Sequence, residues 1–274
     1  MKTFIVPIDF SDTSKNAALY ALHLADQIHD GHIILYHAFD EIVAGDDGTP
    51  LYNDIEARRN IALWGLGNVK NSFNIPSWIE MSCVAEEGTV VKNVHQFAAA
   101  HNADMIVMGI TGSTRLDQIL IGSTTLNVIT HATIPVMIIP PDAVYKGLKN
   151  VVFTSDFKEV EKTTPFVSLL KVLNLFKPKL HVVNVDSEHY VELTDAYKQE
   201  RVIIEENLLG YSPEFSFIRA FDFIEGINRF VDSRNIDALI TVPKKHNFLS
   251  ELFKTSHTKK LAYHSHVPII AIHA

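Results

Sequence analysis

NADMIVMGITGSTRLDQILIGSTTLNVITHATIPVMIIP, residues 102–140, contains two short apolar runs with a glycine-rich segment and a helix-like segment between them. The runs at 104–109 and 135–139 have the length and the Val, Ile and Met content of buried strands. The segment that opens at Gly122 has the residue spacing of a helix. Because a helix between two buried strands is the usual crossover of a parallel sheet, this stretch predicts an α/β fold.

The same alternation extends towards the N-terminus. Short apolar runs recur at 3–8, 32–39 and 79–84, and helical spacing recurs at 14–29, 54–73 and 90–101. Together with the stretch above, these segments predict an open five-stranded parallel sheet with helices on both faces.

The pattern then repeats in the second half of the chain. NADMIVMG at 102–109 matches NIDALITV at 235–242, and ATIPVMIIP at 132–140 matches SHVPIIAIH at 265–273. PIDFS at 7–11 matches TSDFK at 154–158. Further strands are expected at 149–155, 180–185, 215–219, 238–242 and 268–272, and helices at 163–176, 195–209 and 221–234. We infer a tandem duplication that is interrupted at PPDAVYKG, 140–147, and predict two domains, 1–144 and 145–274.

Composition limits the classes of partner and compartment. The 274 residues are 47% hydrophobic and carry a formal charge of −8, which disfavours binding to nucleic acid or to an anionic membrane surface. Cys83 is the single cysteine, so no intrachain disulfide can form and a reducing compartment fits best. The N-terminal residues lack the pattern of a signal peptide, and no apolar run is long enough to span a membrane. We therefore expect a cytoplasmic protein.

The glycine-rich segment has the chemistry of an anion site. Gly109, Gly112 and Gly122 have the spacing G-x2-G-x9-G, and hydroxyl residues follow at 123–125. Ligands of an open parallel sheet bind beyond the carboxyl ends of its strands. A helix that opens at Gly122 would present unpaired backbone amides and the positive end of its dipole there. This combination indicates a phosphate site, although a tight turn followed by a helix start is the simpler alternative.

The spacing is neither that of a Walker A loop, since no lysine follows the third glycine, nor that of the dinucleotide fingerprint G-x-G-x-x-G. It resembles the nucleotide-binding loop of the universal stress protein family. The flanking segments VPIDFSDTSKNAALYALHLA at 6–25, ILYHAFD at 34–40 and EEGTVVKNVHQFAAAHNADMIVMGITG at 86–112 also resemble that family in the expected order. The resemblance covers nearly the whole chain in a tandem form. It implies a Rossmann-like, adenine nucleotide alpha hydrolase-like fold and ATP as ligand, alone or with Mg²⁺.

The resemblance also implies a role for each matching residue. Pro7 and Asp9 would border the adenosine, with Asp9 accepting hydrogen bonds from adenine or ribose, and Ala38 would offer backbone groups to the adenine edge. The other implied residues are Met108 and Gly109 for the adenosine pocket and Gly112, Gly122, Ser123, Thr124 and Thr125 for the phosphates. Asp9 has an alternative role as a turn residue or as a helix cap, for which residues 11–14 compete.

The second half departs from the glycine pattern. At the corresponding positions it has Val242, Lys245 and Thr255, and it keeps only the following serine, Ser256. Side chains there would occupy the space in which the backbone approaches a phosphate. We therefore predict one ATP per chain, bound by the first half. An alternative is that Lys244, Lys245 or Lys254 makes the second loop an acceptor for another anion.

No catalytic residue is indicated. Arg115 and Asp117 are the loop's own candidates, and no triad or pair of carboxylates accompanies them. We expect a nucleotide-responsive binding protein of the stress response, with at most slow ATP hydrolysis. Two alternatives remain: an ATPase or phosphotransferase that uses the same pocket, and a scaffold that works without nucleotide.

Two further features concern metals and association. Four histidines near the C-terminus could form a zinc site, but core or exposed histidines are the better interpretation, and we predict no metal: His257, His264, His266 and His273. The apolar runs VMII at 136–139 and IIAI at 269–272 should lie at sheet edges, where uncovered strands pair. We expect either a homodimer or a pseudo-dimer formed by the two halves of one chain.

Overall fold

The computed structural model describes residues 1–39, 54–110, 122–186, 195–220, 223–243 and 267–273. The first half alternates strands and helices as predicted: β1 Lys2–Pro7, α1 Asp12–Ile28, β2 Gly31–Phe39, α2 Ile55–Asn71, β3 Ile79–Glu87, α3 Val90–Ala100, β4 Met105–Gly109, α4 Ser123–His131 and β5 Val136–Ile139. The second half follows with β6 Asn150–Thr154, α5 Val160–Thr163, α6 Phe166–Phe176, β7 Lys179–Asp186, α7 Asp195–Asn207, β8 Glu214–Arg219, α8 Phe223–Arg234, β9 Ala238–Thr241 and β10 Ile269–Ala271.

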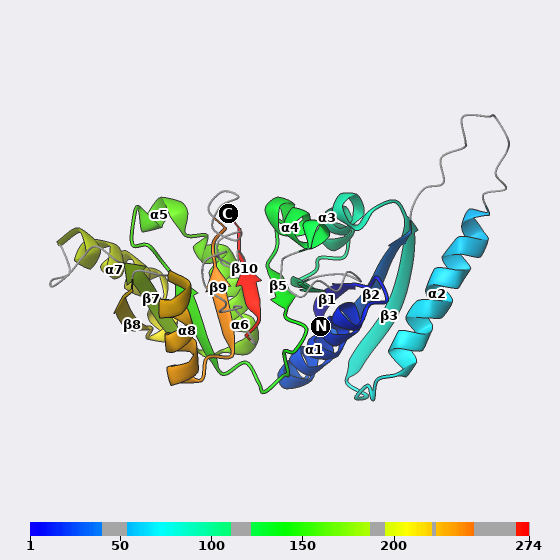
Figure 1. Ribbon diagram of the computed structural model, residues 1–274, viewed down its shortest axis with the longest axis horizontal. Coiled ribbons are helices and arrows are strands. Elements are labelled where there is room, and N and C mark those ends of the chain that lie inside the picture. The colour runs from blue at the N-terminus through cyan, green and yellow to red at the C-terminus, as the bar shows by residue number, and fades with distance from the viewer. Residues whose placement is uncertain (40–53, 111–121, 187–194, 221–222, 244–266, 274) are drawn as a thin grey trace.

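All these strands form one 10-stranded sheet, in the order β3-β2-β1-β4-β5-β10-β9-β6-β7-β8 (Figure 1). Within each half the strands are parallel and follow the same order, so the predicted parallel sheets are confirmed. The halves are not separate sheets, however, because β5 and β10 pair antiparallel at the centre, with Ile270 opposite Met137. This pairing corresponds to the pseudo-dimer expected from the two apolar edges, while a homodimer stays a prediction.

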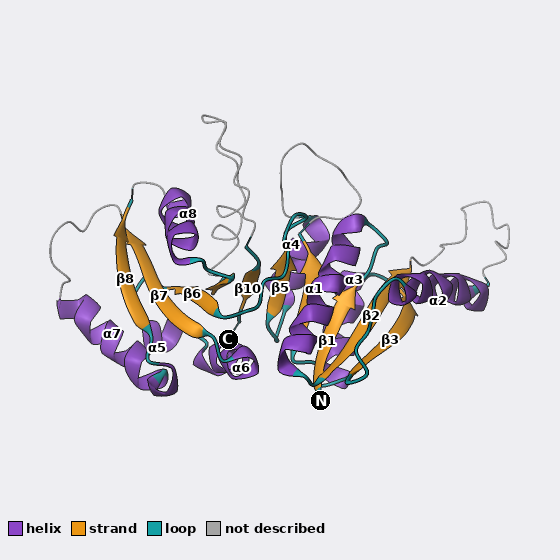
Figure 2. Ribbon diagram, turned by 90° about the horizontal axis from the view of Figure 1, so that it is seen from below, coloured by secondary structure: helices purple, strands orange, loops and turns teal. Residues whose placement is uncertain are grey.

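Helices cover both faces of the sheet (Figure 2). One apolar core includes buried residues of α1, α2, α6 and α7, and the other includes buried residues of α3, α4 and α8. Both cores contain strand residues from the two halves. The reason is that β5 and β10 are hydrogen-bonded, so each face of the sheet continues from one half into the other. The halves therefore share their hydrophobic cores rather than contacting only at a polar interface.

The segment between the halves is held against α1. The side-chain amide of Asn16 donates to the carbonyl oxygens of Pro140, Pro141 and Ala143 at 3.2–3.3 Å. Further along α1, the Gln27 side chain accepts a hydrogen bond from the backbone of Leu148 at 2.8 Å. The interruption predicted at 140–147 is therefore a packed connection in the fold.

One predicted helix differs. The sequence predicts a single helix over 163–176, whereas α5 ends at Thr163 and α6 begins at Phe166. Pro165 lies between them as the N-cap of α6, where its missing N–H and fixed φ are tolerated. Among the described residues, no helix has both the length and the apolar character needed to cross a membrane.

Candidate nucleotide site

The predicted site residues come from strands that meet where the strand order reverses. β1 lies between β2 and β4 in the sheet. The helix that follows β1, α1, and the helix that follows β4, α4, lie on opposite faces of the sheet. Pro7 ends β1, Ala38 lies near the end of β2, and Gly109 ends β4. The carboxyl ends of parallel strands at such a switch point are the usual binding place in α/β folds. The fold thus brings together the residues that the sequence selected from these three strands.

Asp9 follows β1 and is exposed. Its Oδ1 accepts hydrogen bonds from the backbone N–H of Ser11 at 3.0 Å and from the Ser11 hydroxyl at 2.5 Å. Burial alone would raise the pKa of Asp9, but the hydrogen bonds from Ser11 outweigh it, and the pKa lies below its usual value. Ser11 rather than Asp9 caps α1, since its Oγ accepts from the N–H of Ser14 at 3.2 Å. Asp9 is therefore an ionised carboxylate that the turn before α1 holds in place.

Gly109 is in close contact with the first turn of α1. A Cβ at this position would lie 3.0–3.1 Å from the Cγ2, C and O atoms of Thr13. Its glycine is therefore needed for packing between β4 and α1, whether or not a ligand lies nearby. Thr13 is a residue that the sequence alone did not assign to this site.

Thr125 is buried, and its hydroxyl donates to the carbonyl oxygen of Gly109 at 3.0 Å. The resemblance implied that Thr125 contacts phosphate. Here its hydroxyl group instead forms a hydrogen bond that joins the first turn of α4 to the end of β4. In this geometry Thr125 acts as a positioning residue. Ser123 and Thr124, by contrast, are more accessible and can offer their hydroxyls to a ligand.

The N-terminus of α4 has the features of an anion site. Gly122 is its N-cap, with φ −60° and ψ 144°, and, being a glycine, it has no side chain with which to cap the helix. The N–H of Gly122 donates to the carbonyl oxygen of Ile110 at 2.8 Å, which places the helix start directly beside the end of β4. The first amides of an uncapped helix are donors without intrahelical partners and carry partial positive charge.

Apolar side chains surround the same strand ends. Pro7 and Met108 are buried and Ala38 is half-buried. Behind them, the buried Tyr36 donates its hydroxyl to Glu86 at 2.7 Å. Burial and this carboxylate raise the pKa of Tyr36, so the phenol stays protonated and the apolar wall stays uncharged.

Several sequence predictions fall outside the described residues. These are Gly112, Arg115 and Asp117 in the first loop, Lys244, Lys245, Lys254, Thr255 and Ser256 in the second, and His257, His264 and His266. In the described ranges, no group of three or more His, Cys, Asp or Glu residues has an arrangement that could hold a metal ion.

The second half keeps part of the frame. His37 contacts the carbonyl oxygen of Ile8 at 2.7 Å, and Asn184, at the corresponding position, donates to the carbonyl oxygen of Ser155 at 2.9 Å. A cavity of about 190 Å³ is lined there by Asp156, Asn184 and Val242, among others.

Removal of the Thr125 hydroxyl should destabilise the fold. The Thr125→Val variant leaves the carbonyl oxygen of Gly109 without its buried donor, which costs about 1–3 kcal/mol. Urea unfolding followed by circular dichroism would measure the loss. The exposed neighbour provides the control, since Thr124→Val should change stability by less than about 0.5 kcal/mol. Equal midpoints for the two variants would contradict the role assigned to Thr125.

Comparison with known proteins agrees with the resemblance in the sequence. Residues 1–140 match the model of the universal stress protein family. A universal stress protein of Methanocaldococcus jannaschii is 30% identical over 145 residues, which cover 50% of this chain and 81% of that protein. In fold, the chain is similar to a universal stress protein from Archaeoglobus fulgidus, with a TM-score of 0.65 and 19% identity over 98% of this chain and 95% of the other. A protein of unknown function from Pseudomonas aeruginosa has a TM-score of 0.57 and 11% identity over 99% of this chain and 92% of its own. The chain belongs to the universal stress protein family.

Proposed function

We propose that the chain is a nucleotide-responsive stress protein that binds one ATP in its first half. The observation that carries this proposal is the N-terminus of α4, whose N-cap is the glycine Gly122 and which begins beside the end of β4. Donor amides, helix dipole and two accessible hydroxyls converge there, and this set fits a phosphate group. We further propose the division into domains 1–144 and 145–274, which the repeated strand order supports.

The residues at the switch point would hold the nucleotide as follows. Gly122, Ser123 and Thr124 would contact the phosphates, together with Gly112 in the loop, and Pro7, Ala38 and Met108 would enclose the adenosine. Asp9, already ionised, would accept hydrogen bonds from the ribose or adenine. Gly109 and Thr125 would set the distance between β4 and α4. Bound Mg²⁺ would neutralise charge on the phosphates.

Calorimetry with ATP should give about one site per chain. Gly122→Val places two methyl groups beside the first amides of α4 and should weaken binding at least tenfold, because about 1.4 kcal/mol of lost contact is a factor of ten. Ser123→Ala should weaken it less, by about the value of one hydrogen bond. Glycine replacement in α2 serves as the control, since a Cβ at Gly67 would have nothing within 4 Å and Gly67→Ala should leave affinity unchanged. Two equivalent ATP sites would contradict the proposal.

An enzyme and a scaffold that works without nucleotide, the two alternatives to a binding protein, would each behave differently towards ATP. An ATPase or phosphotransferase would turn over ATP steadily, and the turnover would disappear in Gly122→Val. A scaffold that works without nucleotide would purify free of ligand and show no ATP binding. Mass spectrometry of the denatured protein therefore tests the proposal directly, because an adenine nucleotide at about one per chain is the expected result.

A further inference from the structure

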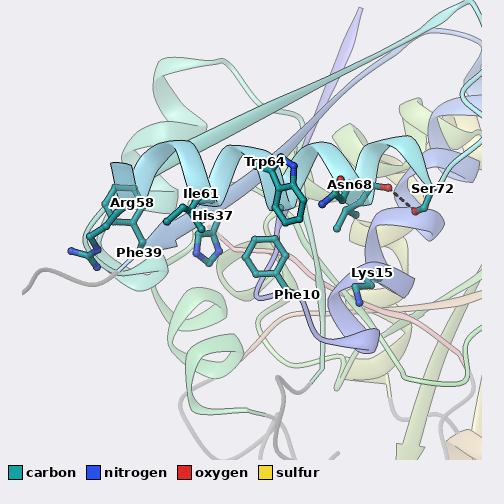
Figure 3. A pocket seen from close by; sticks show the side chains of 12 residues that line it. Phe10, Lys15, His37, Phe39, Arg58, Ile61, Trp64, Asn68 and Ser72 are labelled. Atoms are coloured by element: carbon teal, nitrogen blue, oxygen red, sulfur yellow. Dashed lines mark hydrogen bonds between the residues drawn. The ribbon is translucent and has the colours of Figure 1, made fainter. Parts of the chain in front are cut away.

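A concave site lies on the opposite side of β2 from the proposed nucleotide site. It is a groove of about 740 Å³ between α2 and the start of α1 (Figure 3). Its lining includes Phe10, Lys15, His37, Phe39, Arg58 and Trp64 and none of the described residues assigned to the nucleotide. The separation follows from strand geometry, because neighbouring residues such as His37 and Ala38 point to opposite faces. The volume lies within the range of about 300–1,000 Å³ that ligand pockets occupy.

The wall that α2 contributes is unusually apolar for a helix surface. Ile61 and Trp64 are 70% and 72% exposed, and Figure 3 shows both beside the rings of His37 and Phe10. Lining residues recur along α2 from Arg58 to Ser72, so the groove extends over about four helical turns, or roughly 20 Å. Its shape therefore suits an elongated apolar body.

Gly65 lets α2 lie directly on Phe10. A Cβ at this position would be 2.9 Å from Cε1 and 3.0 Å from Cζ of the Phe10 ring. A glycine inside a helix costs about 1 kcal/mol relative to alanine, and here it gives the helix access to the aromatic floor. Phe10 itself has φ 66°, a left-handed conformation that is uncommon outside glycine, and this conformation follows directly after Asp9.

In the second half, aromatic side chains cluster at the corresponding positions. Phe157, which shares the left-handed conformation of Phe10, lies 5.1 Å from the ring of Phe217 and 6.0 Å from that of Tyr197. Phe217 pairs with Asn184 in the sheet register, and the equivalent partner of His37 is Ala85.

At a second pair of equivalent positions, the first half again has a small residue and the second half a phenylalanine. Phe215 pairs with Val182, and the equivalent partner of Leu35 is Cys83. Small residues in the first half thus stand where phenylalanines stand in the second. These differences at equivalent positions distinguish the two halves in the part of the chain that the structure describes.

Charge favours an anion in the groove. Its described lining includes Lys15 and Arg58 and no carboxylate, although the chain carries a formal charge of −8. The Nζ atom of Lys15 lies 3.8 Å from Asp12, a solvent-exposed pair of the kind that contributes little. Arg58 stacks on Phe39 with its guanidinium 5.2 Å from the ring centroid. In Figure 3 these two cations lie towards opposite ends of the apolar wall.

We propose that this groove binds a small amphipathic carboxylate, with its apolar chain along α2 against Trp64 and Phe10 and its carboxylate at Lys15. This inference is independent of ATP binding, because none of the described lining residues belongs to the nucleotide site.

Tryptophan fluorescence with sodium decanoate tests the proposal. In a Trp78→Phe background, Trp64 reports on the groove alone. In Trp64→Phe, Trp78 reports on a site outside the groove lining, where it donates to Asp26 at 3.0 Å. Saturable binding should change the emission of Trp64 and leave that of Trp78 unchanged. Affinity should rise by about fourfold for each added CH₂ between hexanoate and decanoate. No saturable response of Trp64, or an equal response of Trp78, would overturn the proposal.

Variants separate the apolar and charged contributions. Ala85 does not line the groove but is buried against Phe39 and Ala62, which do. Ala85→Phe, which copies the second half, should displace these two side chains and weaken decanoate binding, measured by calorimetry on protein whose circular dichroism shows it folded. Trp64→Ala changes an exposed residue, carries little risk to folding, and should weaken binding at least tenfold. Lys15→Gln should weaken decanoate binding by about two- to fivefold and leave that of neutral 1-decanol unchanged.

Three further results would overturn the proposal. They are unchanged decanoate binding in both Trp64→Ala and folded Ala85→Phe, equal weakening of decanoate and 1-decanol binding by Lys15→Gln, and stoichiometric displacement of decanoate by ATP. Absence of ATP binding with intact decanoate binding would instead refute the proposed function and leave this inference standing.

Discussion

The Ile270→Asp variant should lose more than about 4 kcal/mol of folding free energy, because it combines an uncompensated buried charge with the loss of a core side chain. Ile270 is 0% exposed and lies in β10 between β5 and β9. Its ladder partner is Met137, and its side chain belongs to the core that the two halves share. A carboxylate there has no solvent and no partner cation among the apolar core residues. Since whole domains are stable by about 5–15 kcal/mol, this one change should unfold much of the protein at room temperature.

Urea unfolding followed by circular dichroism would measure this loss, and two further variants define its cause. Ile270→Val removes a single methylene and should cost about 1 kcal/mol, which remains measurable if the aspartate variant does not fold. Val144→Asp places the same charge at a position that is 74% exposed in the connection between the halves, and its midpoint should change little. If Ile270→Asp unfolded at the same urea concentration as Val144→Asp, the ladder between β5 and β10 would not be a buried junction.

Most of the fold was predictable because buried strands and amphipathic helices leave strong local patterns. The predicted strand at 104–109 became Met105–Gly109, and the helix predicted at 90–101 became Val90–Ala100. The joining of both halves into one sheet was harder to predict. The sequence predicts that the two apolar edge strands pair, but no local pattern shows whether they pair with each other within one chain or with those of a second chain. Pro165 was a visible signal for the break between α5 and α6.

The site was predictable only in part from the sequence. The glycine spacing selected Gly109 and Gly122, and the strand order brought these two residues together. The contact between Gly109 and Thr13 could not be inferred, because it depends on how closely α1 approaches the sheet. The groove beside Trp64 was also missed. Its one sequence signal is the pair Cys83 and Ala85 where the second half has phenylalanines, and that signal needs the strand register to be recognised.

The Gly109→Val variant should be destabilised by about 2–3 kcal/mol, and it should bind ATP at least tenfold more weakly. A Cβ at Gly109 already lies 3.1 Å from backbone atoms of Thr13, and backbone in the first turn of a helix moves less readily than a flexible side chain. The added methyl groups would push α1 away from the end of β4. Because Asp9 and Ser11 are fixed to the start of α1, the adenosine side of the proposed site would move with it.

The second half has a valine at the position of Gly109. Val242 follows β9, and the helix that corresponds to α1 is interrupted, with α5 ending at Thr163 and α6 beginning at Phe166. In the first half, α1 is continuous over Asp12–Ile28, so a valine at 109 would meet an unbroken helix. Gly67→Ala is the matched control: with open space around it, the added methyl should raise stability by about 0.5–1 kcal/mol. Thermal unfolding would measure the stability of both variants, and calorimetry would measure their affinity for ATP. If Gly109→Val had wild-type stability and wild-type affinity, the close contact between β4 and α1 would be refuted.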